Sequence, residues 1–285
     1  MLAAAQVSDP HIVATYRHEF HLDAPVPVQY VSWLWNVVHG NWGQSIVYGT
    51  PVTDLVLHAF LDSLLLSIVA AVLAVGVGVL LGALAAKLTV AHAWRPFRIA
   101  AALTPLMLVV IPSFVVALLL TSWFAVDLHW LPATGMHSPG AGSGLDLLRH
   151  IVLPAVALSV APAGATARLA RAALLEVMAE DHVRTARAKG LRESRVFVVH
   201  TLRNAVSPLA TNTAILLASL VSSAVLVESV FAWPGLANLM VSSILARDYP
   251  VIEGGTIIVA ATYIVLNLAV DLMYPLFDPR VRGSR

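Results

Sequence analysis

A basic stretch at residues 181–208 carries the densest set of side chains that could bind a partner. Its cations stand among small residues that leave the backbone open to close approach: Arg184, Arg187, Lys189, Arg192, Arg195 and Arg203. Charge alone favours a segment that fixes membrane topology and touches anionic lipid. Asp181, however, can cap a short helix that runs to Arg187 or Lys189, and Gly190 can end it. Such a short helix is marginal in water and needs tertiary or partner contacts. The order of cap, small residues and stop favours a protein-docking helix, and Ser194 can cap a second one.

The motifs of enzyme chemistry are missing from the rest of the chain. There is no G-x-x-x-x-G-K-[ST] loop for nucleotide phosphates, so any ATP hydrolysis must belong to another chain. The eleven histidines show no metal-ligand spacing, the Ser-Gly pairs form no nucleophile elbow, and there is no cysteine. We therefore expect no catalytic residue, no metal site and no cofactor in this chain.

The composition is that of an integral membrane protein. Hydrophobic residues make up 59% of the chain and charged residues 12%, with a mean hydropathy of +0.82. Soluble domains have about 45–50% apolar residues and about 25% charged residues. The net charge of +1 gives no field that would attract nucleic acid.

Uncharged runs predict an all-α integral membrane protein, a polytopic helical bundle. A membrane-spanning helix needs about 20 apolar residues, and residues 63–86 supply 24 without a charge. Gly78 and Gly82 in this run have the spacing that lets another helix pack closely. Five spans are expected: residues 63–86; 99–126, kinked by Pro105 and Pro112; 151–175, with Arg168 and Arg171 reaching towards water; about 209–227; and about 254–277.

The distribution of Lys and Arg predicts the orientation of these spans. Fourteen lie in the loops and tail on one side and three on the other, which places residues 181–208 and the C-terminus in the cytoplasm. Residues 127–150, an aqueous loop, and 229–250 would lie outside. The expected parts are an extracytoplasmic region 1–53, a transmembrane domain 54–278 with a cytoplasmic loop 176–207, and a cytoplasmic tail 279–285. Five spans leave the N-terminal region outside without a preceding helix, so we expect the intact protein to have a sixth span before this sequence.

Two acidic residues and one helix break stand out in the apolar regions. Glu228 and Asp271 are costly near the bilayer, by about 2.5–3.5 kcal/mol at its centre. Asp271 has no second ionisable residue in its helix, which favours a structural role over a proton relay. Trp233-Pro234-Gly235 should break an outer helix, either as a re-entrant turn or as an interfacial Trp turn. Polar candidates for a pore are Ser67, Thr104, Ser113, Thr211, Asn212, Ser219 and Asn267.

Several segments resemble the permease subunits of binding-protein-dependent ABC importers for dipeptides, oligopeptides and, in some members, nickel. TARAKGL followed by HTLRNAVSP is similar to the cytoplasmic coupling loop of that family. Further likeness lies in PVPVQYVSWLWNVVHGNWGQSI, PVTDLVL, IPSF, VESVFAWPGLANLM, ILARDYPVIEG and NLAVDLMYPLFDPRVR, so that residues 23–282 are covered.

The resemblance implies a multi-pass subunit of a prokaryotic cytoplasmic membrane. Its partners would be membrane lipid, a second permease, two cytoplasmic ATPase subunits that hold ATP and Mg, and an extracytoplasmic binding protein. The helix that sits in the ATPase cleft would be Arg184, Thr185, Ala186, Arg187, Ala188, Lys189, Gly190 and Leu191. Arg184-Thr185-Ala186 replaces the usual Glu-Ala-Ala opening, so a salt bridge from that Glu is not assumed. Structural or pore candidates are Pro112, Ser113, Asn204, Pro208, Trp233, Pro234, Gly235 and Asp271.

Other classes of membrane protein remain open at this point. An ion-coupled transporter or channel that acts without an ATPase would be expected to show internal repeats and paired intramembrane charges, and neither is clear in the sequence. A receptor or scaffold would fit the composition but would not explain the basic loop. Within the resembled family, the sequence does not separate peptide from nickel import.

Overall fold

The computed structural model describes residues 24–91, 94–140, 143–202 and 224–277, together with residues 205, 209, 216 and 220. For residues 266 and 269–277 only the backbone is described. These parts of the chain are helical and contain no strand, only one isolated bridge between Gln44 and Pro51. The all-α prediction is therefore confirmed, whereas most of the fourth predicted span, about 209–227, lies outside the described residues.

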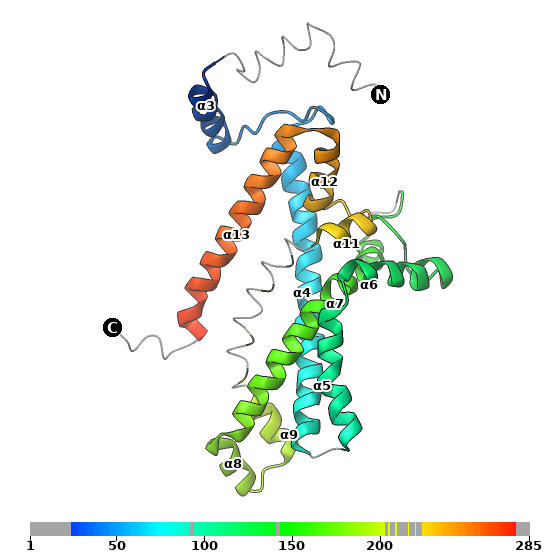
Figure 1. Cartoon of the computed structure of the whole chain (residues 1–285), viewed down its shortest axis with the longest axis vertical. Coiled ribbons are helices and arrows are strands. Elements are labelled where there is room, and N and C mark those ends of the chain that lie inside the picture. The colour runs from blue at the N-terminus through cyan, green and yellow to red at the C-terminus, as the bar shows by residue number, and fades with distance from the viewer. Residues whose placement is uncertain are drawn as a thin grey trace.

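Two long helices form the centre of the bundle. α4 (Val52–Val90) and α7 (Gly144–Ala179) are each long and apolar enough to cross a membrane, and they lie against each other (Figure 1). The buried face of α4 carries a small residue at every fourth position: Ala70, Ala74, Gly78, Gly82 and Ala86. An added Cβ at Gly78 would lie 2.7 Å from Thr166 Cβ, and one at Gly82 would lie 2.6 Å from the Ala167 carbonyl oxygen. The predicted close packing at these glycines is thus confirmed, with α7 as the partner.

The second predicted span is broken rather than kinked. α5 (Arg95–Val110) is followed by α6 (Ser113–Leu120) and the π-helical turn η1 (Thr121–Asp127), and the two halves meet at 95°. Ile111 is extended, the conformation that a following proline favours, and Pro112 is the N-cap of α6. Pro105, by contrast, is accommodated within α5. The single kinked helix over 99–126 was therefore wrong at Pro112.

α7 begins earlier than the sequence suggested. Ser143 caps it by accepting a hydrogen bond from the Asp146 backbone nitrogen at 3.3 Å. Residues 144–150 are consequently the first two turns of the helix, so the predicted aqueous loop 127–150 ends at residue 143 instead of 150. Pro154 and Pro162 both lie inside α7 without ending it.

At the upper end of the molecule in Figure 1, α12 (Leu236–Ala246) and the first turns of α13 (Tyr249–Phe277) lie around the start of α4, with α3 (Val26–Val38) beside them. α11 (Val225–Val230) lies below α12, and α13 then runs down the side of the bundle. An apolar cluster that includes Val52, Val56, Leu236 and Val251 joins α4, α12 and α13. α13 confirms a helix over the fifth predicted span.

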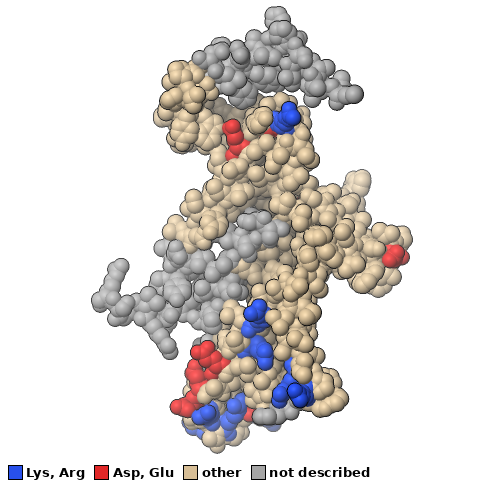
Figure 2. Space-filling model, in the orientation of Figure 1, with Lys and Arg blue, Asp and Glu red and all other residues tan. Residues whose placement is uncertain are grey.

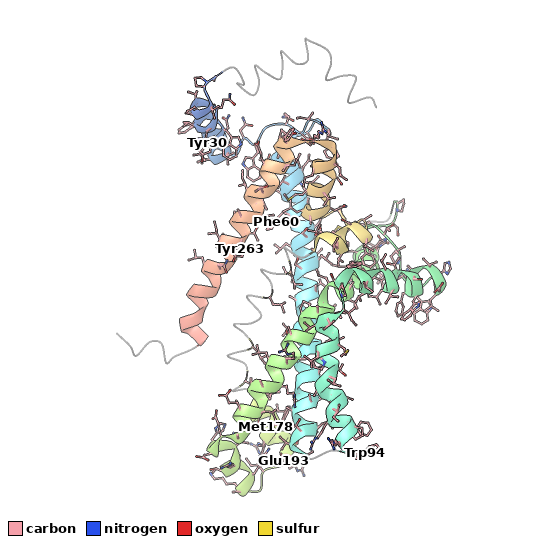
Figure 3. The ribbon with its side chains drawn as sticks, viewed as in Figure 1. Tyr30, Phe60, Trp94, Met178, Glu193 and Tyr263 are labelled. Atoms are coloured by element: carbon pink, nitrogen blue, oxygen red, sulfur yellow. The ribbon has the colours of Figure 1, made fainter. Side chains whose placement is uncertain are left out.

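The lower end holds the basic segment. α8 (Asp181–Ala188), α9 (Glu193–Arg195) and the π-helical η2 (Val196–Leu202) fold back beside the end of α7. Figure 2 shows most of the visible Lys and Arg at this end, around α8 and the lower parts of α4 and α5. The side-chain view in Figure 3 places Met178, Glu193 and Trp94 there as well. The two ends of the bundle therefore differ in charge.

Candidate functional site

α8 is a short helix with one face buried in its own chain and one face exposed. Val183 and Ala186 pack with Val177 of α7 and Val196 of η2, and Leu191 lies against the same cluster. These contacts supply the tertiary support that a helix of 8 residues needs. The opposite face is open to a partner.

Backbone geometry fixes both ends of α8. Glu180, with φ −71° and ψ 152°, interrupts the helix between α7 and α8 and is the N-cap residue, whereas Asp181 lies in the first turn. The predicted cap at Asp181 is therefore wrong by one residue, because the chain leaves α7 at Glu180. Gly190 has φ +76°, as predicted. Its N–H donates to the Arg187 carbonyl at 2.9 Å, and the Leu191 N–H reaches the Ala186 carbonyl at 3.4 Å, which is the Schellman pattern.

The exposed face of α8 carries Arg184, Thr185 and Ala188, and Lys189 and Gly190 follow it. The side chain of Arg184 is 72% exposed and lies 3.8 Å from the Asp181 carboxylate. Small side chains beside it let a partner approach the helix backbone. This surface is polar and shallow, and it can dock against another protein without any chemistry of its own.

Three residues of the predicted coupling segment are engaged within the chain. Ala186 is buried and Leu191 is half-buried in the α8 cluster, so both hold α8 in place rather than face a partner. Arg187 Nε donates to Glu193 Oε1 at 3.0 Å, which joins α8 to α9. Ser194 lies inside α9, whose N-cap is Arg192, so the predicted cap at Ser194 is wrong. The turn after Gly190 is two residues tighter than the spacing suggested, because the N-cap is Arg192 and not Ser194.

The Trp233 turn at the upper end encloses a buried carboxyl group. The helix break at Trp233, Pro234 and Gly235 is confirmed, since α11 ends at Val230 and α12 begins at Leu236. Trp233 is fully buried and its Nε1 donates to the Asp62 carbonyl at 3.0 Å. Pro234 is exposed. The turn is therefore packed onto α4 and is not a free interfacial loop.

Glu228 is the centre of this arrangement. Its Oε1 accepts from Ser63 Oγ at 2.5 Å and its Oε2 accepts from the Asn238 backbone nitrogen at 3.0 Å. Ser63 Oγ accepts in turn from the Leu236 N–H at 2.8 Å. A Cβ at Gly235 would collide with the Glu228 carboxyl group, so only glycine fits there. The carboxyl group thus caps α12, where free N–H groups and the helix dipole favour it.

A second buried carboxyl group ties the N-terminal region to the corner between α12 and α13. Asp248 is fully buried and accepts hydrogen bonds from Ser45 Oγ at 2.5 Å and from the Ile46 and Val47 backbone nitrogens at 3.2 Å. Sequence reasoning singled out Glu228 but found neither its partners nor Asp248. The contacts join residues more than 160 positions apart, so no local pattern shows them.

The remaining polar candidates are dispersed. Ser67 is fully buried in α4, Ser113 starts α6 and is half-buried, and the side chains of Thr104 and Asn267 bond to their own helices at 2.9 Å. Pro112 lies at the break before α6. Thr211, Asn212, Ser219, Asn204, Pro208 and the side chain of Asp271 lie outside the described residues. The structure therefore gathers no pore from those it describes.

The chain is similar to known transport proteins along most of its length. The family described as binding-protein-dependent transport system inner membrane component matches residues 78–283. A putative peptide permease protein of Brucella ovis is 39% identical, covering 93% of this chain and 83% of the relative. The oligopeptide transport system permease protein AppB of Bacillus subtilis is 37% identical, covering 96% and 87%.

Solved structures show a similar fold. The MetNI methionine ABC transporter, in an inward-facing conformation, aligns with a TM-score of 0.64 at 18% identity, covering 79% of this chain and 96% of that one. An amino acid ABC transporter aligns with a TM-score of 0.52 at 20% identity, covering 80% and 94%. The likeness extends across most of the bundle.

Proposed function

Because this chain belongs to the family of binding-protein-dependent transport system inner membrane components, we propose that it is the peptide-translocating permease subunit of an ATP-driven importer. The relatives are named as peptide and oligopeptide permeases, which favours peptides over nickel as the cargo. The subunit works with a second permease, with two ATPase subunits that bind ATP and Mg, and with an extracytoplasmic binding protein. It performs no hydrolysis itself.

The observation that carries this proposal is the placement of α8. It is fastened to the end of α7 by Val183 on one face and presents Arg184, Thr185 and Ala188 on the other. A force applied to the exposed face is therefore passed directly to a transmembrane helix. We assign the exposed face as the contact with the ATPase, with the lower end and the C-terminus in the cytoplasm.

The charge distribution supports this orientation. Loops with many Lys and Arg stay on the cytoplasmic side of a membrane. In the described part of the chain these residues are concentrated at the lower end, where α8 lies (Figure 2). ATP-driven closure of the ATPase pair would tilt α7, and with it α4, because these helices are in close contact along their length.

Co-purification tests the assignment of α8. A tagged chain is expressed with its ATPase and second permease, and the recovered ATPase is quantified. Arg184→Glu with Ala188→Trp should remove the ATPase and abolish ATP-dependent peptide uptake, because one change reverses the exposed charge and the other blocks close approach. Arg95→Glu, an exposed cation at the same end on α5, is the matched control and should retain both.

Three results would contradict parts of the proposal. ATPase recovery that is unchanged in the α8 variant would exclude α8 as the contact. A stable homo-oligomer that transports in an ion gradient without ATPase would favour an ion-coupled transporter instead. Uptake of Ni²⁺ but not of peptides would move the cargo to the alternative within the family.

A further inference from the structure

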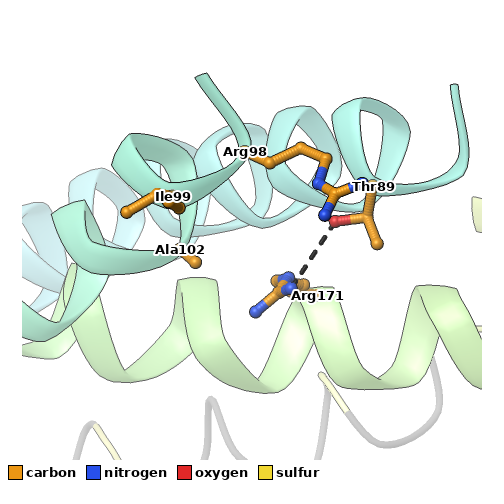
Figure 4. Close-up of a pocket in the computed structure, with 5 residues that line it drawn as sticks. All are labelled: Thr89, Arg98, Ile99, Ala102 and Arg171. Carbon is orange, nitrogen blue, oxygen red and sulfur yellow. Dashed lines mark hydrogen bonds between the residues drawn. The ribbon is translucent and has the colours of Figure 1, made fainter. Parts of the chain in front are cut away.

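A pocket at the lower end of the bundle brings two arginines from different helices together. It has a volume of about 400 Å³ and is lined by Thr89 of α4, Arg98, Ile99 and Ala102 of α5, and Arg171 of α7. Figure 4 shows Arg98 extending towards Thr89, with Arg171 opposite. The pocket lies at the base of three packed helices, at the end of the bundle away from the Trp233 turn.

The positive charge of this pocket is not neutralised within the described chain. No carboxylate lines it, and neither Arg98 nor Arg171 forms an ion pair with a described residue. The Arg171 Nε is buried and has no hydrogen-bond partner among the described residues, while its Nη2 makes a long contact of 3.5 Å to Thr89 Oγ1. An unpaired buried donor on a cation is costly. The sequence expectation that Arg171 simply reaches towards water does not describe this geometry.

We propose that this pocket binds the phosphate group of an anionic phospholipid. A phosphate oxygen pair matches the planar donors of a guanidinium, and two guanidiniums with a hydroxyl between them would surround one headgroup phosphate. Basic pockets between transmembrane helices bind such headgroups. The bound phosphate would supply the acceptor that Arg171 Nε lacks and would offset the repulsion between the two cations.

The surroundings of the pocket favour a lipid over a free phosphate. Trp94 and Phe97, beside the pocket on α5, are 72% and 60% exposed, and aromatic side chains concentrate at the level of lipid headgroups. An exposed apolar row continues from the pocket along one face of α5: Ile99, Leu103, Leu106 and Val110. This row has the spacing of a single helix face. An acyl chain would cover it, whereas a soluble phosphate would leave it bare.

Native mass spectrometry of the purified importer complex in a neutral detergent tests the proposal. Phosphatidylglycerol is titrated against phosphatidylcholine of the same chain length, and inorganic phosphate is added in a separate arm. The wild type should bind phosphatidylglycerol selectively. Arg98→Gln and Arg171→Gln should each weaken this binding about fivefold, the loss expected for one basic residue at a membrane surface. Arg95→Gln removes an exposed cation three residues from Arg98 and outside the pocket, so it should bind as the wild type does.

Three outcomes would overturn the proposal. Phosphatidylglycerol binding that is unchanged in both pocket variants would exclude the site. An equal loss in Arg95→Gln would reduce the effect to general surface charge. Displacement of the lipid by inorganic phosphate at equal concentration would assign the pocket to a soluble anion. Arg98 is exposed, so Arg98→Gln carries the test even if Arg171→Gln fails to assemble. The readout is binding, so it stands independently of the transport function and of which leaflet the pocket faces.

Discussion

Replacing Ser63 by alanine tests whether the carboxyl network holds the upper end of the bundle together. The Ser63 hydroxyl donates to Glu228 and accepts from Leu236 N–H, and both Ser63 and Leu236 are buried. A hydrogen bond between helices in a membrane protein contributes about 0.6 kcal/mol on average and up to about 1.7 kcal/mol. The variant also leaves a buried N–H without an acceptor, which costs about 1–3 kcal/mol. We expect Ser63→Ala to lower the free energy of unfolding by about 2–4 kcal/mol.

Ser67 provides a matched control one turn further along α4. It is as deeply buried as Ser63, but its hydroxyl has no hydrogen-bond partner in the part of the chain that the structure describes. Ser67→Ala therefore removes the same group without removing a bond, and stability should stay unchanged or rise by about 1 kcal/mol. The measurement is unfolding of the detergent-solubilised protein in increasing dodecyl sulfate, followed by tryptophan fluorescence. Equal losses in the two variants would show that the hydrogen bonds of Ser63 contribute nothing specific.

Three further variants test separate features of the fold. Gly78→Val should destabilise the protein by about 1–3 kcal/mol or more by overpacking against Thr166, whereas Gly76→Val, which has open space around it, should be nearly neutral in the same unfolding assay. Gly190→Ala should lower the stability of the α8 turn by about 1–2 kcal/mol, because Gly190 has a positive φ, and should therefore weaken ATPase recovery. Gly190→Asn should recover much more ATPase than Gly190→Ala, since Asn tolerates this conformation better. ATPase recovery equal to wild type in Gly190→Ala would show that the left-handed turn is dispensable. Asp248→Asn places an amide N–H₂ where backbone donors point, so the segment around Ile46 should be cleaved faster in limited proteolysis, and an unchanged rate would contradict this.

The sequence predicted features that depend on neighbours along the chain. The uncharged runs, the break at Trp233 and the left-handed Gly190 are all local, and all three are present. The direction of the break at Pro112 is not local, because it depends on what α6 packs against. Likewise, Asp181 is the better N-cap by residue type, but the chain leaves α7 at Glu180, which takes the N-cap position without a side-chain hydrogen bond.

The burial of Glu228 shows why an acidic residue in an apolar stretch is hard to interpret from sequence. The free-energy cost of a carboxyl group in an apolar stretch is evident from the sequence. The hydrogen bonds that offset this cost come from Ser63, which is 165 positions away, and from the start of the next helix. Nothing in the sequence distinguishes Ser63 from Ser67, whose hydroxyl has no hydrogen-bond partner in the described structure. The difference between these two serines lies entirely in the tertiary fold.

Apolar packing joins both halves of α4 to their neighbours, but in the upper half the cluster of Val52, Val56, Leu236 and Val251 is supplemented by hydrogen bonds. In the lower half, Gly78 and Gly82 bring α7 so close that the pair can separate only by losing a continuous packed surface. In the upper half, the contact with the Trp233 turn includes Ser63 and Glu228, whose hydrogen bonds are directional and few. Packed surfaces resist sliding, whereas a few hydrogen bonds can exchange for water once a gap opens. A displacement received at α8 would therefore move α4 and α7 together.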